Sequence, residues 1–524
     1  AAGAQADDPA GRRTVSGEGG TRRALLAGAV AGGGALLAPA TVAGRLLPDP
    51  TAWRPRRPLA RGGRFAQGVM SGQPDVRGIT LWTQLERPEL PGALELEVAR
   101  DPGFSRVVQR ARVPVRANAA GTASARVEGP MLRPHEQYWY RFATADGSSP
   151  VGRFRTLPPA DSATPVRIGF WSCQMYFMGF FTGQAALAEE DLDLVVCLGD
   201  YVYDTYLDLT RREPRPAGGA GSARTLPEYR AKYAVYRSDA DLRRMHARHA
   251  FVPVWDDHEV ANDYDGEGVD GEGGPAFAAR RAAAYRAWFE HMPVEQRPGA
   301  APRVHRRLRI GRLLDLFLLD TRQYARPGGT LLGEQQRRWL LEGLTGSRAA
   351  WKLLGNPVML MDMANTIDGA VIGAPKHSWQ AHPGERRLVG ETLRARGVQD
   401  VVSIAGDAHA FYAGTATTEG GSRGIPFATE VVAGTMAASN LATSALELLS
   451  PLTGPLAGGL GLAANPHLVF SDAATHGYAV VEARRDELRV ALRAVDTILR
   501  PTASVRTLAS FRVPRGRVAV ERVG

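Results

Sequence analysis

Two short motifs in different halves of the chain combine acidic side chains with a phenol and an imidazole. Each motif follows an apolar run, 194–197 in the first case and 401–404 in the second, and each contains glycine before aspartate. An apolar run closed by glycine is typical of a buried strand that opens into a loop, and ligands of α/β sheets collect at the carboxyl ends of strands. The side chains are those of Asp200, Tyr203, Asp407 and His409. These motifs predict a metal site, and a metal site in a loop cleft indicates hydrolysis.

Three further loops that follow predicted strands add polar candidates. They contain Cys173, the run Asp257, His258 and Glu259, and Asn356. Carboxylate, imidazole, thiolate and phenolate groups all carry the lone pairs that metal ions need. In the spacing Asp-x-x-Tyr, one turn of loop can return the phenol to the ion that the carboxylate binds. Asp200 has two oxygens and can therefore bridge two ions.

Each candidate also has a simpler structural explanation. Asp200 and Asp407 could cap helices, and Asn356 before proline could mark a turn. Tyr203 and Cys173 could be packed core side chains. The combination of several strand-end loops favours a metal site over these alternatives.

Composition limits the classes of function. The chain has 524 residues, 44% of them hydrophobic and 23% charged, which is typical of a soluble protein with two or more domains. The formal net charge is +10. No basic block with interleaved aromatic residues occurs, which argues against a specific nucleic-acid partner; attraction to phosphate-bearing substrates or the arginine bias of a GC-rich genome explains the charge. Only Cys173 and Cys197 are present, so a disulfide framework is excluded.

The first residues resemble a signal for export. Arg22 and Arg23 precede a weakly apolar run that reaches Leu37, and small residues follow up to Ala43. This pattern is similar to a twin-arginine signal peptide over residues 1–43, and a disordered tail or a short anchor is the alternative. It predicts the twin-arginine translocase as a partner and a secreted or cell-envelope location.

The remaining chain has two patterns. Residues 63–157 alternate polar and apolar side chains over short runs, which predicts a small N-terminal β-sandwich. From residue 166 to about 515, strand-like and helix-like segments alternate, which predicts an α/β layer fold. The Ala/Leu/Gly/Pro-rich residues 441–465 are expected to form a mobile flap.

Taken together, the motifs resemble those of the alkaline phosphatase D (PhoD) family of calcineurin-like metallophosphoesterases. The matching runs are 65–72, 81–83, 171–174, 198–203, 255–259, 320–324, 332–336 and 476–478. The resemblance covers about residues 63–515. It implies a two-sheet α/β sandwich as the catalytic domain over 166–515, preceded by a fibronectin- or Ig-like β-sandwich over 63–157.

The resemblance also implies a ligand set for two ions. Fe³⁺ would be bound by Cys173, Asp200, Tyr203 and His409, and Ca²⁺ by Asp200, Asp257 and Asp407. Anionic thiolate and phenolate donors favour Fe³⁺, whereas carboxylates with water suit Ca²⁺. Asp257 replaces the asparagine that is usual in the superfamily, and Asn356 stands where a histidine is common. The identity of the second metal therefore stays open.

Two residues, His258 and Arg237, are expected to act on the substrate. His258 would supply a proton or hydrogen bond to the leaving oxygen, and Glu259 would orient it; a structural pair is the alternative. Arg237 could hold a phosphoryl oxygen with its guanidinium or be an ordinary surface charge. Asp320, Arg322 and Tyr324 are expected to form a structural strand-end network rather than to contact substrate.

The resemblance implies an exported, metal-dependent alkaline phosphatase or phosphodiesterase that uses a metal-activated water in a dinuclear site. Its substrates would be small or polymeric phosphate esters, and the protein would be a monomer. Two alternatives stay open. One is a phospholipase D-like or teichoic-acid phosphodiesterase, which the apolar 441–465 segment favours. The other is a non-catalytic envelope protein that binds phosphate or metal.

Overall fold

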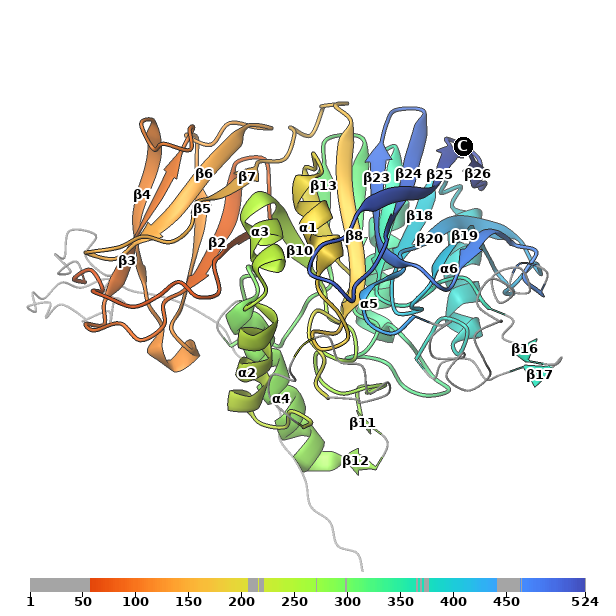
Figure 1. The fold of residues 1–524 in the computed structure, drawn as a ribbon. Helices are drawn as coiled ribbons and strands as arrows, with labels where there is room; N and C mark the ends of the chain where they lie inside the picture. Colours follow the sequence, from red (N-terminus) through yellow and green to blue (C-terminus); the bar gives the residue numbers. More distant parts are fainter. Residues whose placement is uncertain are drawn as a thin grey trace, which may run out of the picture. The chain divides into compact units, whose positions relative to one another are not determined.

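Figure 1 shows the computed structural model of the chain, whose contacts divide it into two units, Ala1–Pro55 and Arg56–Gly524. The structure describes residues 57–205, 215, 221–269, 271–296, 299–363, 366–367, 370–371, 377–440, 462 and 464–523, all of which belong to the second unit. The predicted signal segment 1–43 and nearly all of the predicted flap 441–465 lie outside these residues.

Eleven strands form the first large sheet. They are β1 (Val69–Gly72), β2 (Gly78–Gln84), β5 (Thr122–Glu128), β8 (Val166–Gln174), β9 (Leu194–Cys197), β10 (Ala250–Pro253), β21 (Thr435–Ala437), β23 (His476–Ala483), β24 (Glu487–Val495), β25 (Val505–Pro514) and β26 (Glu521–Arg522). Their order is β26-β25-β24-β23-β8-β9-β10-β1-β2-β5, with β21 paired to β8. The central strands β8, β9, β10 and β1 are parallel, so the loops after β8, β9 and β10 leave the sheet at one edge.

Seven strands form the second large sheet. They are β13 (Arg306–Ile310), β14 (Leu314–Leu318), β15 (Trp351–Asn356), β18 (Val401–Ala405), β19 (Phe411–Thr417), β20 (Pro426–Val432) and β22 (Leu468–Asp472). The order is β13-β14-β15-β18-β20-β19-β22, and β14, β15, β18 and β20 are parallel. The carboxyl ends of β15 and β18 are therefore neighbours.

The N-terminal strands are shared between two sheets. A four-stranded sheet contains β3 (Ala93–Ala99), β4 (Val107–Pro114), β6 (Gln137–Ala143) and β7 (Gly152–Arg155). The strands β1, β2 and β5 instead extend the first large sheet, because β1 pairs with β10 through Ser71 and Ala250. Leu96 and Tyr138 share one buried cluster with Ile79 and Leu81, as the two layers of a β-sandwich require. The predicted sandwich thus has one sheet in common with the neighbouring α/β fold, and its boundaries 63–157 stay a prediction.

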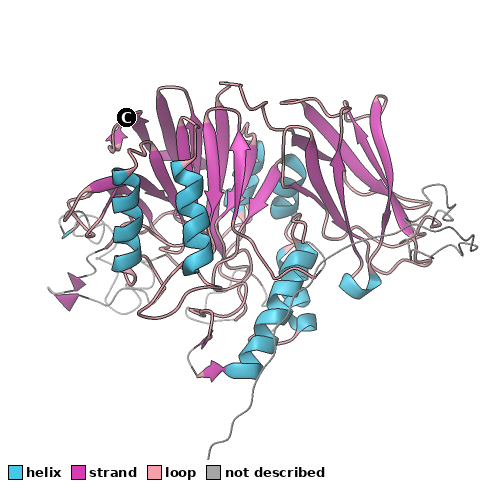
Figure 2. Cartoon of the chain, turned by 180° about the vertical axis from the view of Figure 1, so that it is seen from behind, coloured by secondary structure: helices cyan, strands magenta, loops and turns pink. Residues whose placement is uncertain are grey.

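Helices cover the outer faces of both large sheets, and Figure 2 shows helices lying over the strands. The α-helices of the described residues are α1 (Thr182–Glu189), α2 (Leu226–Tyr236), α3 (Ala240–Arg248), α4 (Gly274–His291), α5 (Gly333–Thr345) and α6 (Pro383–Ala395). A short 3₁₀ turn, η1 (Ala117–Ala119), lies between β4 and β5. Side chains of α1–α4 pack in one cluster with the first sheet, and those of α5 and α6 pack in another with the second sheet. Two-stranded ribbons are formed by β11 (Gly268–Val269) with β12 (Glu272–Gly273) and by β16 (Thr366–Ile367) with β17 (Ala370–Val371).

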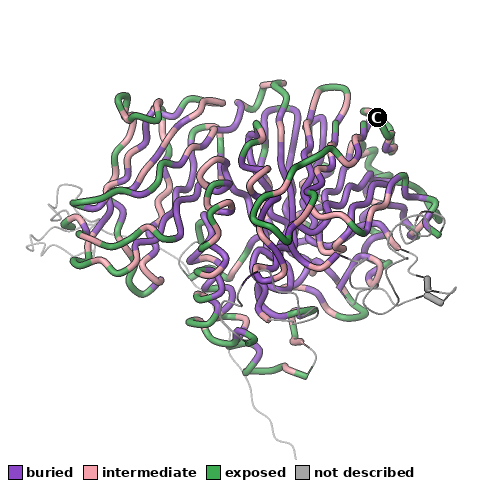
Figure 3. Tube along the Cα trace, viewed as in Figure 1, coloured by how far each residue is buried: buried purple, intermediate pink, exposed green. Residues whose placement is uncertain are grey.

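The alternation of apolar residues along the central strands produces this layering. On β8, Ile168 and Phe170 belong to the core between the two sheets, whereas Trp171 and Cys173 belong to the cluster beneath the helices. A strand buried on both faces is a continuous apolar run, and Figure 3 shows that burial is concentrated on these strands. The predicted two-sheet α/β sandwich, preceded by an N-terminal β domain, is confirmed.

Candidate metal centre

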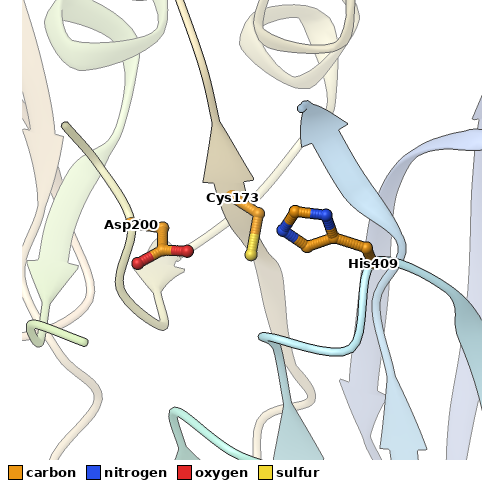
Figure 4. A group of neighbouring side chains, drawn as sticks. All are labelled: Cys173, Asp200 and His409. Carbon is orange, nitrogen blue, oxygen red and sulfur yellow. The ribbon is translucent and has the colours of Figure 1, made fainter. Parts of the chain in front are cut away.

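Loops from both large sheets bring three chemically different donors together. Cys173 is the second-last residue of β8, Asp200 follows β9, and His409 follows β18. One ligand atom from each lies within 4.8 Å of the others, and Figure 4 shows the three side chains converging. Tyr203 joins them: its Oη donates to Asp200 Oδ2 at 3.1 Å and lies 3.3 Å from His409 Nε2. Residues from positions far apart in the chain thus form one cluster.

The backbone at this cluster adopts an uncommon conformation. Cys173, Asp200, Asp407 and His409 have φ values of 58°, 54°, 64° and 51°. Residues other than glycine rarely occupy this left-handed region, and such positions concentrate at functional sites because the surrounding structure must hold them. The strand ends also approach closely, since a Cβ on Gly406 would lie 2.5 Å from Ser172 Oγ. Four of the six predicted ligands therefore have a strained backbone.

Glu259 holds two of these loops through their backbone. Its carboxylate accepts the N–H groups of Asp200 at 3.1 Å, Tyr201 at 2.7 Å and Asp256 at 2.8 Å. The residue is 1% exposed, and burial raises the pKa of its carboxyl to about 7. The prediction that Glu259 orients the His258 ring is therefore wrong. Glu259 instead joins the loop after β9 to the loop after β10.

Asp204 is the carboxylate that contacts His258. His258 Nδ1 lies 3.1 Å from Asp204 Oδ1, and Arg280 on α4 donates to Asp204 Oδ2 at 2.9 Å. The His258 ring also stacks on Tyr203, with centroids 4.0 Å apart and planes at 29°. The sequence analysis missed Asp204. Its only local signal is its place next to Tyr203, and its partner Arg280 lies in a distant helix.

A second group of acids adjoins the first. Oxygens of Asp200 and Asp257 and a nitrogen of His258 lie within 4.8 Å of one another, and so do oxygens of Asp256, Asp257 and Asp407. Asp200 and Asp257 thus connect the groups, as a bridge between two ions would require.

Arg322 lies among these acids. Its NH2 group is 3.3 Å from Asp407 Oδ1 and 3.5 Å from Asp257 Oδ1, and its Nε donates to Asp256 Oδ1 at 2.5 Å. The sequence analysis expected Arg322 in a structural network with Asp320. Asp320 does accept the backbone N–H groups of Arg322 and Gln323, but the Arg322 side chain faces the acids. It is a fixed positive charge beside the predicted second ion.

Burial of these groups changes their pKa values strongly. It raises the pKa of the Cys173 thiol, the Asp200 carboxyl and the Tyr203 phenol well above the ordinary values, and neighbouring anions add to each shift. Burial likewise raises the pKa of Asp407 to about 6. At Asp257 burial acts in the same direction, but the charges of Arg322 and His258 outweigh it and hold the pKa at about 2. Anionic donors buried together favour a bound cation.

The donor set fits metal ions on two further observations. Among the described residues, Asp257 Oδ1 accepts no hydrogen bond, and its one close cation is the Arg322 guanidinium at 3.5 Å, so the oxygen keeps lone pairs that a metal ion could use. His409 Nδ1 lies 2.5 Å from the carbonyl oxygen of Ser439, which can only accept. Nδ1 therefore carries the proton, and the lone pair is on Nε2, on the side of Tyr203. Burial lowers the pKa of His409 to about 4, so the ring is neutral near pH 7.

Arg237 and Asn356 were the remaining predicted site residues. Arg237 is 0% exposed; its Nε donates to Tyr201 Oη at 3.0 Å, its NH2 donates to the carbonyl oxygen of His291, and its guanidinium lies 4.6 Å from the Trp82 ring. The expectation of a phosphoryl contact from Arg237 is corrected, because these structural contacts occupy the guanidinium. Asn356 ends β15 and accepts a hydrogen bond from Trp379 Nε1 at 3.2 Å.

Comparison with known proteins gives consistent results. Residues 168–492 match the family model of PhoD-like phosphatases, and residues 52–158 match the model of the PhoD-like phosphatase N-terminal domain. Alkaline phosphatase D of Bacillus subtilis is 33% identical over an aligned length of 383 residues. The match covers 67% of this chain and only 65% of that relative's own length. A solved structure of PhoD is 29% identical, with a TM-score of 0.80, and the match covers 88% of this chain and 92% of that one. A purple acid phosphatase from yellow lupin seeds, 13% identical with a TM-score of 0.53 over 86% of this chain and 74% of that one, shares the fold.

The Arg237 contacts generate a prediction about stability. Arg237→Met should lower the free energy of unfolding by about 2–4 kcal/mol, because it leaves buried acceptors without their donor. Arg387→Met, which removes an exposed helix arginine, should change it by less than about 0.5 kcal/mol. Urea unfolding measures both. A higher KM for phosphate esters with unchanged stability would instead support a substrate contact for Arg237.

Proposed function

Because this chain belongs to the PhoD-like phosphatase family, we propose that it is a metal-dependent phosphoric ester hydrolase of the alkaline phosphatase and phosphodiesterase type. The observation that carries the proposal is the convergence of Cys173, Asp200, Tyr203 and His409 beside Asp257 and Asp407. This buried cluster contains a thiol, a phenol, an imidazole nitrogen and several carboxylates. Burying so many polar groups costs hydration free energy that packing alone would not repay. The same arrangement is suitable for binding cations that activate water.

We assign the two predicted ions by donor chemistry. Cys173, Tyr203, Asp200 and His409 would hold Fe³⁺, because thiolate and phenolate favour a strongly Lewis-acidic ion. Asp200, Asp257 and Asp407 would hold Ca²⁺ or another hard divalent ion. When bound, the two cations would polarise the phosphate and lower the pKa of a water molecule.

The residues of the chain itself then have separate tasks. His258, whose side chain is 11% exposed, would donate a proton or hydrogen bond to the leaving oxygen. Asp204 would act as its positioning residue, because the contact at Nδ1 fixes the ring while leaving Nε2 for the substrate. Arg322 would offset part of the negative charge of Asp257 and Asp407, so that these acids remain ionised beside the anionic substrate.

The alternative functions have less support. A phospholipase D-like or teichoic-acid phosphodiesterase was inferred from residues 441–465, nearly all of which lie outside the described residues. A non-catalytic phosphate- or metal-binding protein would not require His258 to be held by Asp204 next to the donor cluster. We therefore retain the esterase, acting on small or polymeric phosphate esters, as the proposal.

The proposal includes export. It is based on the twin-arginine pattern at Arg22 and Arg23, which would direct the chain through the twin-arginine translocase to the cell envelope or the medium. In the part of the chain that the structure describes, no helix is both long enough and apolar enough to span a bilayer. We further propose that the protein acts as a monomer.

The bridging role of Asp200 leads to the main functional test. The metal-loaded protein should hydrolyse p-nitrophenyl phosphate or its bis-ester, and Asp200→Asn should lose both metals and all activity. The two substrates distinguish monoesterase from diesterase activity. Elemental analysis and initial rates measure the effect. The control is Asp193→Asn, which also removes a buried carboxylate but one that pairs with Arg155 and His135. Full metal content and activity in Asp200→Asn would contradict the bridge.

The proposed phenolate ligand leads to a spectroscopic prediction. The iron-loaded protein should absorb visible light through tyrosinate-to-iron charge transfer, and Tyr203→Phe should lose that band. Tyr236→Phe is the matched control, since its Oη lies close to the cluster but accepts backbone N–H groups, among them that of Tyr203 at 3.1 Å. An unchanged band in Tyr203→Phe would exclude Tyr203 as an iron ligand.

The proposed acid His258 leads to a prediction about leaving groups. His258→Ala should keep its metals and slow hydrolysis of an alkyl phosphate by ~10²–10⁴-fold, the range of general-acid help. The p-nitrophenyl ester should be affected less, because its leaving group needs little protonation. Asp204→Asn should show a smaller loss with the same dependence on leaving group. Equal losses for both esters would mean that His258 is not the acid.

A further inference from the structure

Asn356 lies at the edge of the proposed site and has an unusual set of partners. It is the last residue of β15, is 0% exposed, and pairs in register with Ala405, the last residue of β18. The chain after Ala405 leads within two residues to Asp407. The next residue after Asn356, Pro357, accepts the N–H of Gly406 at 3.1 Å. Asn356 is thus fixed against the loop that carries Asp407.

The indole of Trp379 determines which way the Asn356 amide faces. Trp379 Nε1 lies 3.2 Å from Asn356 Oδ1, and Trp379 is itself 1% exposed. An indole N–H can only donate, so the atom opposite it must be the amide oxygen. The usual ambiguity between the oxygen and nitrogen of an asparagine side chain is therefore removed. The NH₂ group must lie at the other corner of the amide.

The NH₂ group of Asn356 is buried, and it has no acceptor among the residues that the structure describes. Burying such a donor without an acceptor costs free energy, and native proteins retain few of them. At the end of β15, next to the strand end whose loop carries Asp407, the simplest reason to retain it is an acceptor that arrives with the substrate.

The neighbouring donors cannot easily take this role. Arg322 already contacts Asp256, Asp257 and Asp407. His258 is held by Asp204 and is assigned to the leaving oxygen. A cationic side chain at this position would pair with the neighbouring carboxylates. The amide of Asn356 is neutral, so it stays free to donate to an anionic group.

We propose that Asn356 donates a hydrogen bond from Nδ2 to a phosphoryl oxygen of the bound ester, that it does not ligate a metal, and that Trp379 is the positioning residue that presents this donor. The amide nitrogen has no free lone pair for a metal, and the amide oxygen faces the indole. This inference rests on the proposed phosphoesterase function, because it assigns a substrate contact within that site.

The test uses two substitutions that differ in one property. Asn356→Asp keeps an acceptor for the Trp379 indole but removes the amide donor, whereas Asn356→Leu removes both. If the donor binds phosphate, both variants of the metal-loaded protein should bind inorganic phosphate about 10- to 100-fold more weakly by calorimetry. Both should show a correspondingly higher KM for p-nitrophenyl phosphate and an unchanged metal content. Trp379→Phe should show a smaller increase in KM, because the amide loses its fixed orientation.

Each other outcome has a defined meaning. Asn356→Asp could bind phosphate like the wild type while Asn356→Leu only unfolds more easily. Asn356 would then serve only to accept the hydrogen bond of the Trp379 indole, and the inference would be wrong. Loss of metal from Asn356→Leu would show a ligand instead of a donor, which also overturns it. If the wild type itself neither binds phosphate nor hydrolyses esters, the proposed function fails first. Wild-type activity with unaffected variants rejects the inference alone.

Discussion

The structure depends on one constraint: it buries several acidic metal-donor groups with too little positive charge around them to balance their charge. Cys173, Asp200, Tyr203 and Asp407 all have pKa values raised by burial, and neighbouring acidic groups add to each of the four shifts. A fold retains such groups only when another interaction compensates the loss of hydration. Cations held between the loops of two sheets would provide that compensation, and the same charge would make the site reactive toward phosphate esters.

The surrounding structure reduces this cost without removing it. Glu259 joins the loops after β9 and β10 through three backbone N–H groups, and Arg322 places one positive charge among Asp256, Asp257 and Asp407. The left-handed backbone at four of the six predicted ligands would be unfavourable in isolated segments, and packing against the strand ends must maintain it. The site is therefore preorganised, which lowers the cost of ordering when a ligand binds.

Two side chains outside the donor cluster add directional contacts. Asp204, held by Arg280 from α4, determines the orientation of the His258 ring, and Trp379 determines that of the Asn356 amide. In both pairs a buried partner with only one possible hydrogen-bonding role selects the orientation of an ambiguous group. Such supporting contacts hold the groups of a site in a fixed geometry.

The sequence by itself determined the layered α/β class and the loops that carry the chemistry, because a buried strand followed by glycine and an acid is a local pattern. The ligand assignment stays a prediction, although the cluster places its members together. Only the tertiary structure decided that Asp204 and not Glu259 contacts His258, that Arg322 faces the acids while Arg237 is a structural link, and that β1, β2 and β5 extend the first large sheet. These outcomes depend on partners such as Arg280 or β10, which are distant in sequence. Local periodicity and spacing do not predict which buried charges will pair. The pairing is determined when segments that are distant in the sequence pack together as layers.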